Sequence, residues 1–123
     1  MPKTVAVIGA SSDRRKFGNK ALRAFAHSGY TVIAINPNER EVEGRRTYAS
    51  VLDVPGTIDM ATVYVPPEIG ERVMEELAQK GIAEVWLNPG ADGRAVLARA
   101  RALGLKTILA CSIIGIGESP ANY

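Results

Sequence analysis

The sequence has 123 residues, of which 46% are hydrophobic and 23% are charged, the composition of an ordinary globular protein with one domain. The formal net charge of +2 creates no electrostatic demand for a nucleic-acid partner, and no apolar run approaches the ~20 residues that cross a bilayer. A single cysteine, Cys111, excludes an intramolecular disulfide and indicates a reducing compartment, and the first residues lack the pattern of a signal peptide. We therefore expect a cytoplasmic single domain over residues 1–123, with neither a membrane nor a nucleic acid as its partner.

Five apolar runs rich in β-branched residues predict the strands of the fold. They are Val5–Ile8, Tyr30–Ile35, Met60–Val65, Ala83–Leu87 and Thr107–Ala110. Such near-continuous apolar runs are typical of strands that are covered on both faces, as in a parallel sheet. Tyr64 and Trp86, which lie within two of these runs, are expected in the core.

Amphipathic stretches between the strands predict three helices. Apolar side chains recur at helical spacing before Gly29, before Gly81 and before Gly104, and each glycine stands where a helix C-cap is expected. The connection from Asn38 to Ile58 is less regular, and it predicts a charged loop with one short helix around Ser50–Val54.

The alternation of strands and helices predicts the topology. With right-handed crossovers, it favours a Rossmann-like, doubly wound α/β domain whose five-stranded parallel sheet has the order 3-2-1-4-5. We expect the tail from Gly115 to Tyr123 to be loosely ordered or to take part in a subunit contact.

Turn residues gather where the predicted strands end. These segments are Gly9–Ser12, Asn36–Asn38, Val65–Pro67, Asn88–Gly90 and Cys111–Ser112. In an open parallel sheet, ligands bind beyond the carboxyl ends of the strands, where the strand order reverses. Glycine and proline are also ordinary turn residues, but their grouping with a basic cluster on one edge favours a binding site there.

The loop after the first strand has the backbone of an anion site. Gly9 permits a tight turn, and Ser11 and Ser12 supply hydroxyl and amide donors. The next helix begins near Phe17–Gly18, so the positive end of its dipole lies at the same place.

Cations lie in this loop as well. Arg14, Arg15 and Lys16 exceed the charge of Asp13 by two, and cations before a helix N-terminus are unfavourable unless an anion offsets them. A solvated basic loop is the alternative interpretation.

Two familiar phosphate motifs do not fit this loop. Gly9 and Gly18 are too far apart for a P-loop, and Asn19 follows the second glycine in place of lysine. An NAD site needs an acidic residue at the end of the second strand, where this chain has Asn36. A variant that accepts NADP, with Arg40 on the 2′-phosphate, stays open.

A set of motifs along the chain forms a recognisable whole. The motifs are Gly9-Ala10-Ser11 after a strand, a basic loop to Gly18, Gly29-Tyr30, Asn36-Pro37, Gly44-Arg45 with Tyr48 before Ser50–Asp53, and Val85–Leu87 before Pro89-Gly90. Together they resemble the small stand-alone CoA-binding proteins, which are similar to the CoA-binding domain of the succinyl-CoA synthetase alpha subunit. The resemblance covers essentially the whole chain.

The resemblance implies a Rossmann-like domain that binds coenzyme A or an acyl-CoA without chemistry of its own, as a sensor or a carrier. The binding residues it implies are Gly9, Ala10, Ser11, Ser12, Asn36, Pro37, Leu87, Asn88 and Pro89, with Arg40 near the position of a lysine in the synthetase.

The chemistry of CoA suits the remaining candidate residues. Its phosphates would be met by Arg14, Arg15, Lys16 and the helix start at Gly18, through charge-assisted hydrogen bonds. Pro66 would offer a dry wall to the adenine or the pantetheine.

Catalytic machinery is sparse in the sequence. His27 is the only histidine and lies at the end of the first predicted helix, just before its C-cap and away from the phosphate loop, and no cluster has metal-ligand spacing. We therefore expect a binding protein, without a metal, that is not an enzyme. Cys111 is either a structural thiol or a site of mixed-disulfide formation with CoA.

Other functions stay open at this point. One is an NADP-binding, oxidoreductase-like or redox-sensing domain, and another is an interaction subunit without a ligand. A homo-oligomer and an unknown partner protein are both compatible with the sequence.

Overall fold

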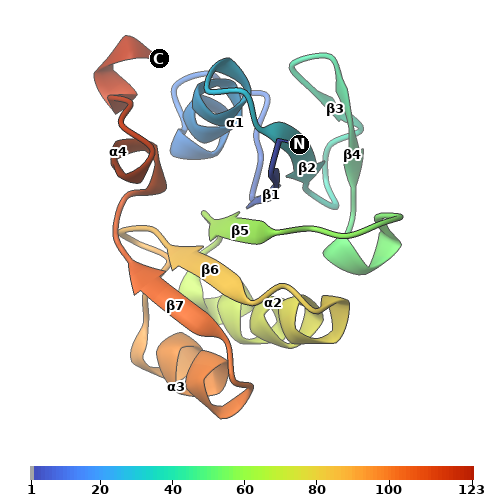
Figure 1. Cartoon of the computed structure of the whole chain (residues 1–123), viewed down its shortest axis with the longest axis vertical. Coiled ribbons are helices and arrows are strands. Elements are labelled where there is room, and N and C mark those ends of the chain that lie inside the picture. Colours follow the sequence, from blue (N-terminus) through green and yellow to red (C-terminus); the bar gives the residue numbers. More distant parts are fainter. Residues whose placement is uncertain (1) are drawn as a thin grey trace.

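Seven strands pair into one sheet in the computed structural model of the chain, which describes residues 2–123 (Figure 1). The strands are β1 (Thr4–Ile8), β2 (Thr31–Ile35), β3 (Glu41–Val42), β4 (Arg45–Tyr48), β5 (Met60–Val63), β6 (Glu84–Leu87) and β7 (Lys106–Leu109). Their order in the sheet is β3-β4-β2-β1-β5-β6-β7, and all neighbouring strands are parallel except β3 and β4. The α/β class and the mostly parallel sheet are therefore confirmed.

The predicted strand order is wrong in one respect. The five predicted strands all form, but they lie in the order 2-1-3-4-5, because β5 pairs with β1 (Val5 opposite Met60) and not with β2. The place beside β2 belongs to β4, which pairs Ala34 with Thr47 and comes from the segment predicted to be irregular. The chain therefore builds outward from β1 in one direction and from β5 in the other, and the order reverses between these two strands.

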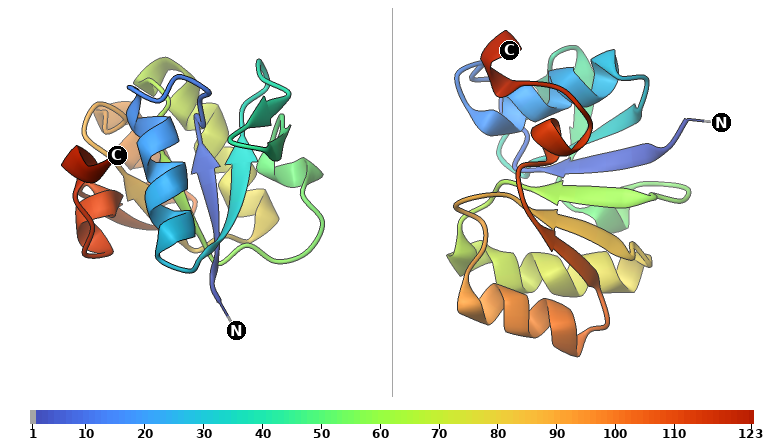
Figure 2. Two further views of the ribbon diagram at one scale, coloured as in Figure 1. Left: turned by 90° about the horizontal axis from the view of Figure 1, so that it is seen from above. Right: turned by 60° about the vertical axis from the view of Figure 1, so that its left-hand side comes forward.

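Helices cover both faces of the sheet (Figure 2). The helix α1 (Phe17–His27) lies on one face, and α2 (Pro67–Lys80) and α3 (Arg94–Ala102) lie on the other, together with the short η1 (Val51–Asp53). The side chains of β1 alternate between the two cores: Val5 and Val7 pack with α1, whereas Ala6 and Ile8 pack toward α2. Because both faces are apolar, the polar ends of the strands are the part of the sheet that is open to a ligand.

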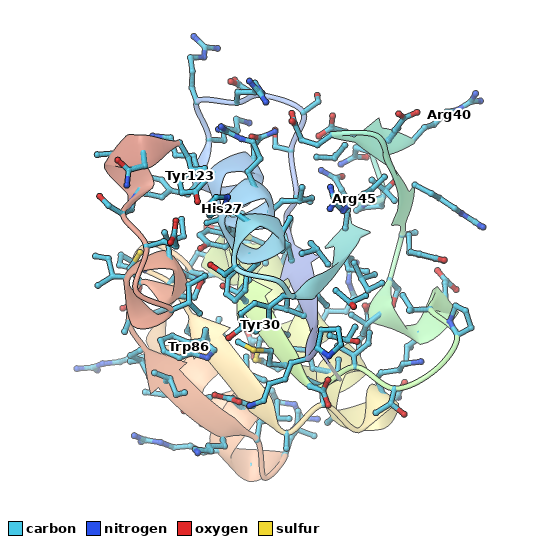
Figure 3. All side chains as sticks on the ribbon, turned by 45° about the horizontal axis from the view of Figure 1, so that its top comes forward. His27, Tyr30, Arg40, Arg45, Trp86 and Tyr123 are labelled. Carbon is cyan, nitrogen blue, oxygen red and sulfur yellow. The ribbon has the colours of Figure 1, made fainter. Side chains whose placement is uncertain are left out.

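The C-terminal segment is ordered, so the first of the two predicted alternatives, a loose tail, is wrong, whereas the subunit contact stays a prediction. It forms α4 (Ser112–Gly115) and η2 (Pro120–Asn122), which lie on the same side of the sheet as α1. Arg23 donates a hydrogen bond to the backbone oxygen of Tyr123 at 3.1 Å, and its guanidinium lies 5.6 Å from the centre of the Tyr123 ring. Figure 3 shows Tyr123 beside His27, whose ring centre is 6.5 Å away. This packing places the end of the chain against α1.

Candidate ligand-binding site

A cavity of about 690 Å³ lies at the carboxyl ends of β1, β2, β5 and β6. Its lining residues are Gly9, Ser11, Lys16, Phe17, Gly18, Asn36, Asn38, Glu39, Tyr64, Val65, Pro66, Pro89, Gly90 and Ala91. The cavity is centred on β1 and β5, where the strand order reverses, and its volume lies within the usual range for a small-molecule site, roughly 300–1,000 Å³.

The first loop lies against the start of α1 because of two glycines. Gly9 has φ of +91°, and its amide donates to the carbonyl of Ile35 at 3.0 Å. A Cβ built on Gly18 would overlap the carbonyl oxygen of Gly9 and lie 3.1 Å from its carbonyl carbon. Only glycine at position 18 therefore allows this approach, which places the first turn of α1 at the wall of the cavity.

Two of the three loop cations form ion pairs with neighbouring carboxylates. Arg14 pairs with Glu43 at 2.9 Å and Arg15 pairs with Asp13 at 3.0 Å. Hydrogen bonds from Arg15 lower the pKa of Asp13 to about 2, and a hydrogen bond from Arg14, with a second from Asn19, lowers the pKa of Glu43 to about 2. The excess positive charge predicted for the loop is thus reduced by an acidic residue that lies 29 positions away in the sequence.

Lys16 differs from the two arginines. It lines the cavity, and within residues 2–123 no salt bridge engages its ammonium group. As the N-cap residue of α1 it stands beside the helix start. Among the three cations, Lys16 is therefore the one positioned to meet an anion in this cavity.

A carboxylate lies across the cavity from the helix start. The oxygens of Glu39 accept hydrogen bonds from the amide of Ser12 at 3.0 and 3.1 Å, and Glu39 lines the cavity. The Ser12 amide, predicted as a phosphate donor, is therefore occupied by an anion of the chain itself. The sequence carried a signal for this residue, since Glu39 stands three positions after the strand end at Asn36, where dinucleotide sites carry an acid.

Asn36 holds the first loop to the end of β2. Its side-chain amide donates to the carbonyl of Ala10 at 2.7 Å, and its side-chain oxygen accepts from the amide of Asn38 at 2.8 Å. Asn36 also lines the cavity, so this side chain both fixes the loop and borders the ligand space.

Asn88 is buried in a polar network. Its side-chain amide donates to the hydroxyl of Thr62 at 2.7 Å and to the carbonyl of Val63 at 3.0 Å, while its oxygen accepts from the amide of Ser112 at 2.9 Å. The Ser112 hydroxyl in turn contacts the Thr62 hydroxyl at 2.7 Å. This network joins α4 to β5 and β6, and the hydrogen-bonding groups of the Asn88 side chain are engaged within the protein.

Tyr64 borders the ligand space, whereas it was predicted to be a core residue. It lines the main cavity and two smaller ones, of about 240 and 310 Å³. Its hydroxyl lies 3.1 Å from that of Ser112, and partial burial raises the pKa of the phenol. Position 64 follows the last residue of β5, and this explains why its side chain reaches the edge of the sheet.

The predicted site residues divide by location. Those that line the main cavity are Gly9, Ser11, Lys16, Gly18, Asn36, Pro66 and Pro89; Pro37 lines the 240 Å³ cavity and Asn88 the 310 Å³ cavity. Those that line none of these three cavities are Ala10, Ser12, Arg14, Arg15, Arg40 and Leu87. Leu87 is buried in the core with α2 and α3, and Figure 3 shows Arg40 extending outward from the fold.

Six further lining residues were not predicted individually as binding residues. They are Phe17, Asn38, Glu39, Val65, Gly90 and Ala91. Most flank a residue that was named, so the segments were found although their individual members were not.

Two further findings concern residues 2–123. No group of three His, Cys, Asp or Glu side chains within them is placed to hold a metal ion. None of their helices combines the length and apolar character that a membrane crossing requires.

Comparisons with known proteins agree with this geometry. The family model described as the CoA binding domain matches residues 3–116. An alpha subunit of an ADP-forming acetate–CoA ligase from Pyrococcus furiosus is 35% identical over an alignment 137 residues long, which covers 98% of this chain and 29% of the relative. An ADP-forming acetate–CoA ligase from Archaeoglobus fulgidus is 40% identical over 81 residues, 66% of this chain and 12% of the relative. This chain therefore spans less than a third of the length of these ligases.

A solved structure of similar size shares the fold. A hypothetical protein from Pyrococcus horikoshii superposes with a TM-score of 0.83 at 31% identity, over 89% of this chain and 76% of that one. The family model matches nearly the whole chain, and the fold has its cavity where the strand order reverses. This chain therefore belongs to the CoA binding domain family.

Proposed function

We propose that this chain binds coenzyme A or an acyl-CoA in the 690 Å³ cavity and catalyses no reaction on it. The observation that carries the proposal is the meeting of Lys16, Ser11 and the first turn of α1 at one wall of this cavity, in a chain of the CoA binding domain family. A helix start with a free ammonium group is suited to a pyrophosphate.

Support for binding without catalysis comes from the site itself. Within residues 2–123 the cavity lining includes neither a histidine nor a cysteine, and its one carboxylate, Glu39, is engaged with the Ser12 amide. A carrier or sensor needs only the ligand's recognition, and the free thiol of Cys111 is compatible with the reducing conditions of a cytoplasm.

The experiment measures the affinity of the purified chain for CoA, NADP and NAD by calorimetry and thermal shift. We expect CoA to bind and to raise the melting temperature, since a ligand that binds only the folded state stabilises it. Lys16→Ala should weaken CoA binding by about tenfold, as expected for the loss of one charge-assisted hydrogen bond. Lys106→Ala is the matched control, because Lys106 is exposed at the opposite end of the sheet.

Two results would contradict the proposal. Preferential binding of NADP would favour the oxidoreductase-like alternative, which the outward direction of Arg40 disfavours. No response to any nucleotide would favour an interaction subunit.

A second candidate is the CoA-binding part of a larger ADP-forming ligase. It is favoured by the 35% identity to the ligase alpha subunit along 98% of this chain. Turnover of acetyl-CoA with ADP and phosphate by the chain alone would contradict the non-catalytic proposal. A part of a ligase should instead support this turnover only when the rest of the ligase is added to the chain.

A further inference from the structure

An apolar cavity of about 310 Å³ adjoins the main one on the side of the C-terminal segment. Four segments of the chain form it: Phe17 at the start of α1, Tyr64 after β5, Asn88-Pro89 after β6, and the C-terminal segment with Cys111, Ile114 and Pro120. Phe17 and Ile114 are 52% and 64% exposed, so two large apolar side chains remain in contact with solvent at the mouth of this cavity. Apolar surface in this position is unfavourable unless something covers it.

The two cavities share one boundary. Phe17, Tyr64 and Pro89 line both, so the two spaces adjoin at these three side chains. Tyr64 is one of these shared residues, and its hydroxyl lies 3.1 Å from that of Ser112. A phenol hydroxyl can donate one hydrogen bond and accept others, so Tyr64 offers a polar partner where the two spaces meet.

The interior of the smaller cavity offers little to water. The one amide in its wall, on Asn88, makes its hydrogen bonds to Thr62, Val63 and Ser112. An ordered water needs two to four polar partners, whereas the other walls are proline, aromatic, isoleucine and cysteine side chains. An apolar group therefore suits this space better than a solvated one.

We propose that this cavity takes the acyl group of an acyl-CoA, so that the preferred ligand is a thioester with a short apolar acyl chain and not free CoA. The inference rests on the proposed function, since it needs the CoA moiety in the main cavity. The thioester would then lie at the boundary, with its carbonyl oxygen within reach of Tyr64. A volume of about 310 Å³ is at the lower end for a small-molecule site and suits a chain of a few carbons.

The experiment is a chain-length series on the intact protein. The dissociation constants of CoA, acetyl-CoA, butyryl-CoA and hexanoyl-CoA are measured by calorimetry under one set of conditions. Each buried methylene should tighten binding by up to about fourfold until the cavity is filled. We expect butyryl-CoA or hexanoyl-CoA to bind at least tenfold more tightly than CoA.

Two variants locate the effect. Ile114→Ser removes an apolar wall at an exposed position, and it should reduce the ratio of hexanoyl-CoA to CoA affinity at least threefold. Leu109→Ser is the matched control, because Leu109 is also about half exposed, at 51%, but lies outside the cavity lining, and its ratio should equal that of the wild type.

The outcomes separate this inference from the proposed function. Failure of CoA and of every acyl-CoA in the series to bind would refute both. Tight binding of CoA with equal affinities across the chain-length series would overturn only the acyl cavity, and so would an Ile114→Ser variant that keeps the wild-type ratio.

Discussion

Gly18→Ala should lower both the stability of the domain and its affinity for CoA. Alanine is the better helix former, by about 1 kcal/mol relative to glycine inside a helix, and Gly18 lies in the first turn of α1. Propensity alone therefore predicts a stabilised protein. The structure predicts the opposite, because the added methyl group would overlap the carbonyl oxygen of Gly9.

The size of the effect follows from what would have to move. Both partners of the overlap belong to the backbone, so no side-chain rotation can relieve it. Forcing an extra carbon into a packed position costs about 1–3 kcal/mol, and we expect a value at or above the upper end here. After subtraction of the helix-propensity gain, the net loss is about 2 kcal/mol, which corresponds to a decrease of roughly 8 °C in the melting temperature for a domain of this size.

The assay combines urea denaturation with calorimetric titration of CoA. The affinity should fall together with the stability, since α1 and the first loop form opposite sides of the close approach and both line the cavity. Gly29→Ala is the control: its φ of +90° makes alanine unfavourable there, by about 1–2 kcal/mol, but an added Cβ meets no atom within 4 Å. This variant should lose stability and keep the wild-type affinity. A Gly18→Ala protein as stable as the wild type, with unchanged affinity, would refute the reasoning.

Two other predictions concern the charges around the cavity. Glu39→Gln should strengthen CoA binding about fivefold at low salt, because a carboxylate and a phosphate oxygen about 4 Å apart repel by about 1 kcal/mol even in water. Calorimetry at two salt concentrations tests this prediction. A weaker complex would indicate that Glu39 binds the ligand directly. The ion pairs of Asp13 and Glu43 should make the protein lose stability in acid. Each carboxyl has a folded-state pKa of about 2, below its ordinary value. Its contribution to the free energy of unfolding is therefore complete above pH of about 4.5 and is lost as the pH falls toward 2. Urea denaturation of the wild type and of Glu43→Gln between pH 2 and 7 should show a smaller acid loss in the variant, and identical slopes would contradict the assignment.

The elements that sequence reasoning found are those with a strong apolar pattern. All five predicted strands and three predicted helices form, and the short helix predicted around Ser50–Val54 is present as η1. Burial on both faces leaves a continuous apolar signal in a strand such as β1, whose residues Val5, Ala6 and Val7 are fully buried.

The elements that were missed lack such a pattern. The strands β3 and β4 consist of Glu41–Val42 and Arg45–Tyr48, in which Val42 alone is buried, because they form the edge of the sheet. Without β4, no sequence signal indicated that the place beside β2 was taken, and this produced the error in the strand order. The ordered tail was missed for a similar reason, since its contacts with Arg23 depend on residues 100 positions apart.

The site shows the same division between local and long-range information. Local patterns indicated the loop, the helix start and the strand ends that line the cavity. The partners of the cations left no local pattern, because Arg14 and Glu43 are 29 positions apart in the sequence. The resulting distribution of charge is asymmetric: Lys16 lies at the α1 side of the cavity and the Glu39 carboxylate at the β2 side. A ligand with phosphate groups is therefore best accommodated with its pyrophosphate toward α1. A phosphate on its ribose, in CoA as in NADP, would have to displace Glu39 from the Ser12 amide in order to bind at the end of β2. Because both nucleotides carry a ribose phosphate, we expect the proposed selectivity for an acyl-CoA over NADP to come from the other end of the ligand, where the apolar cavity beside Phe17 and Ile114 would take the acyl chain.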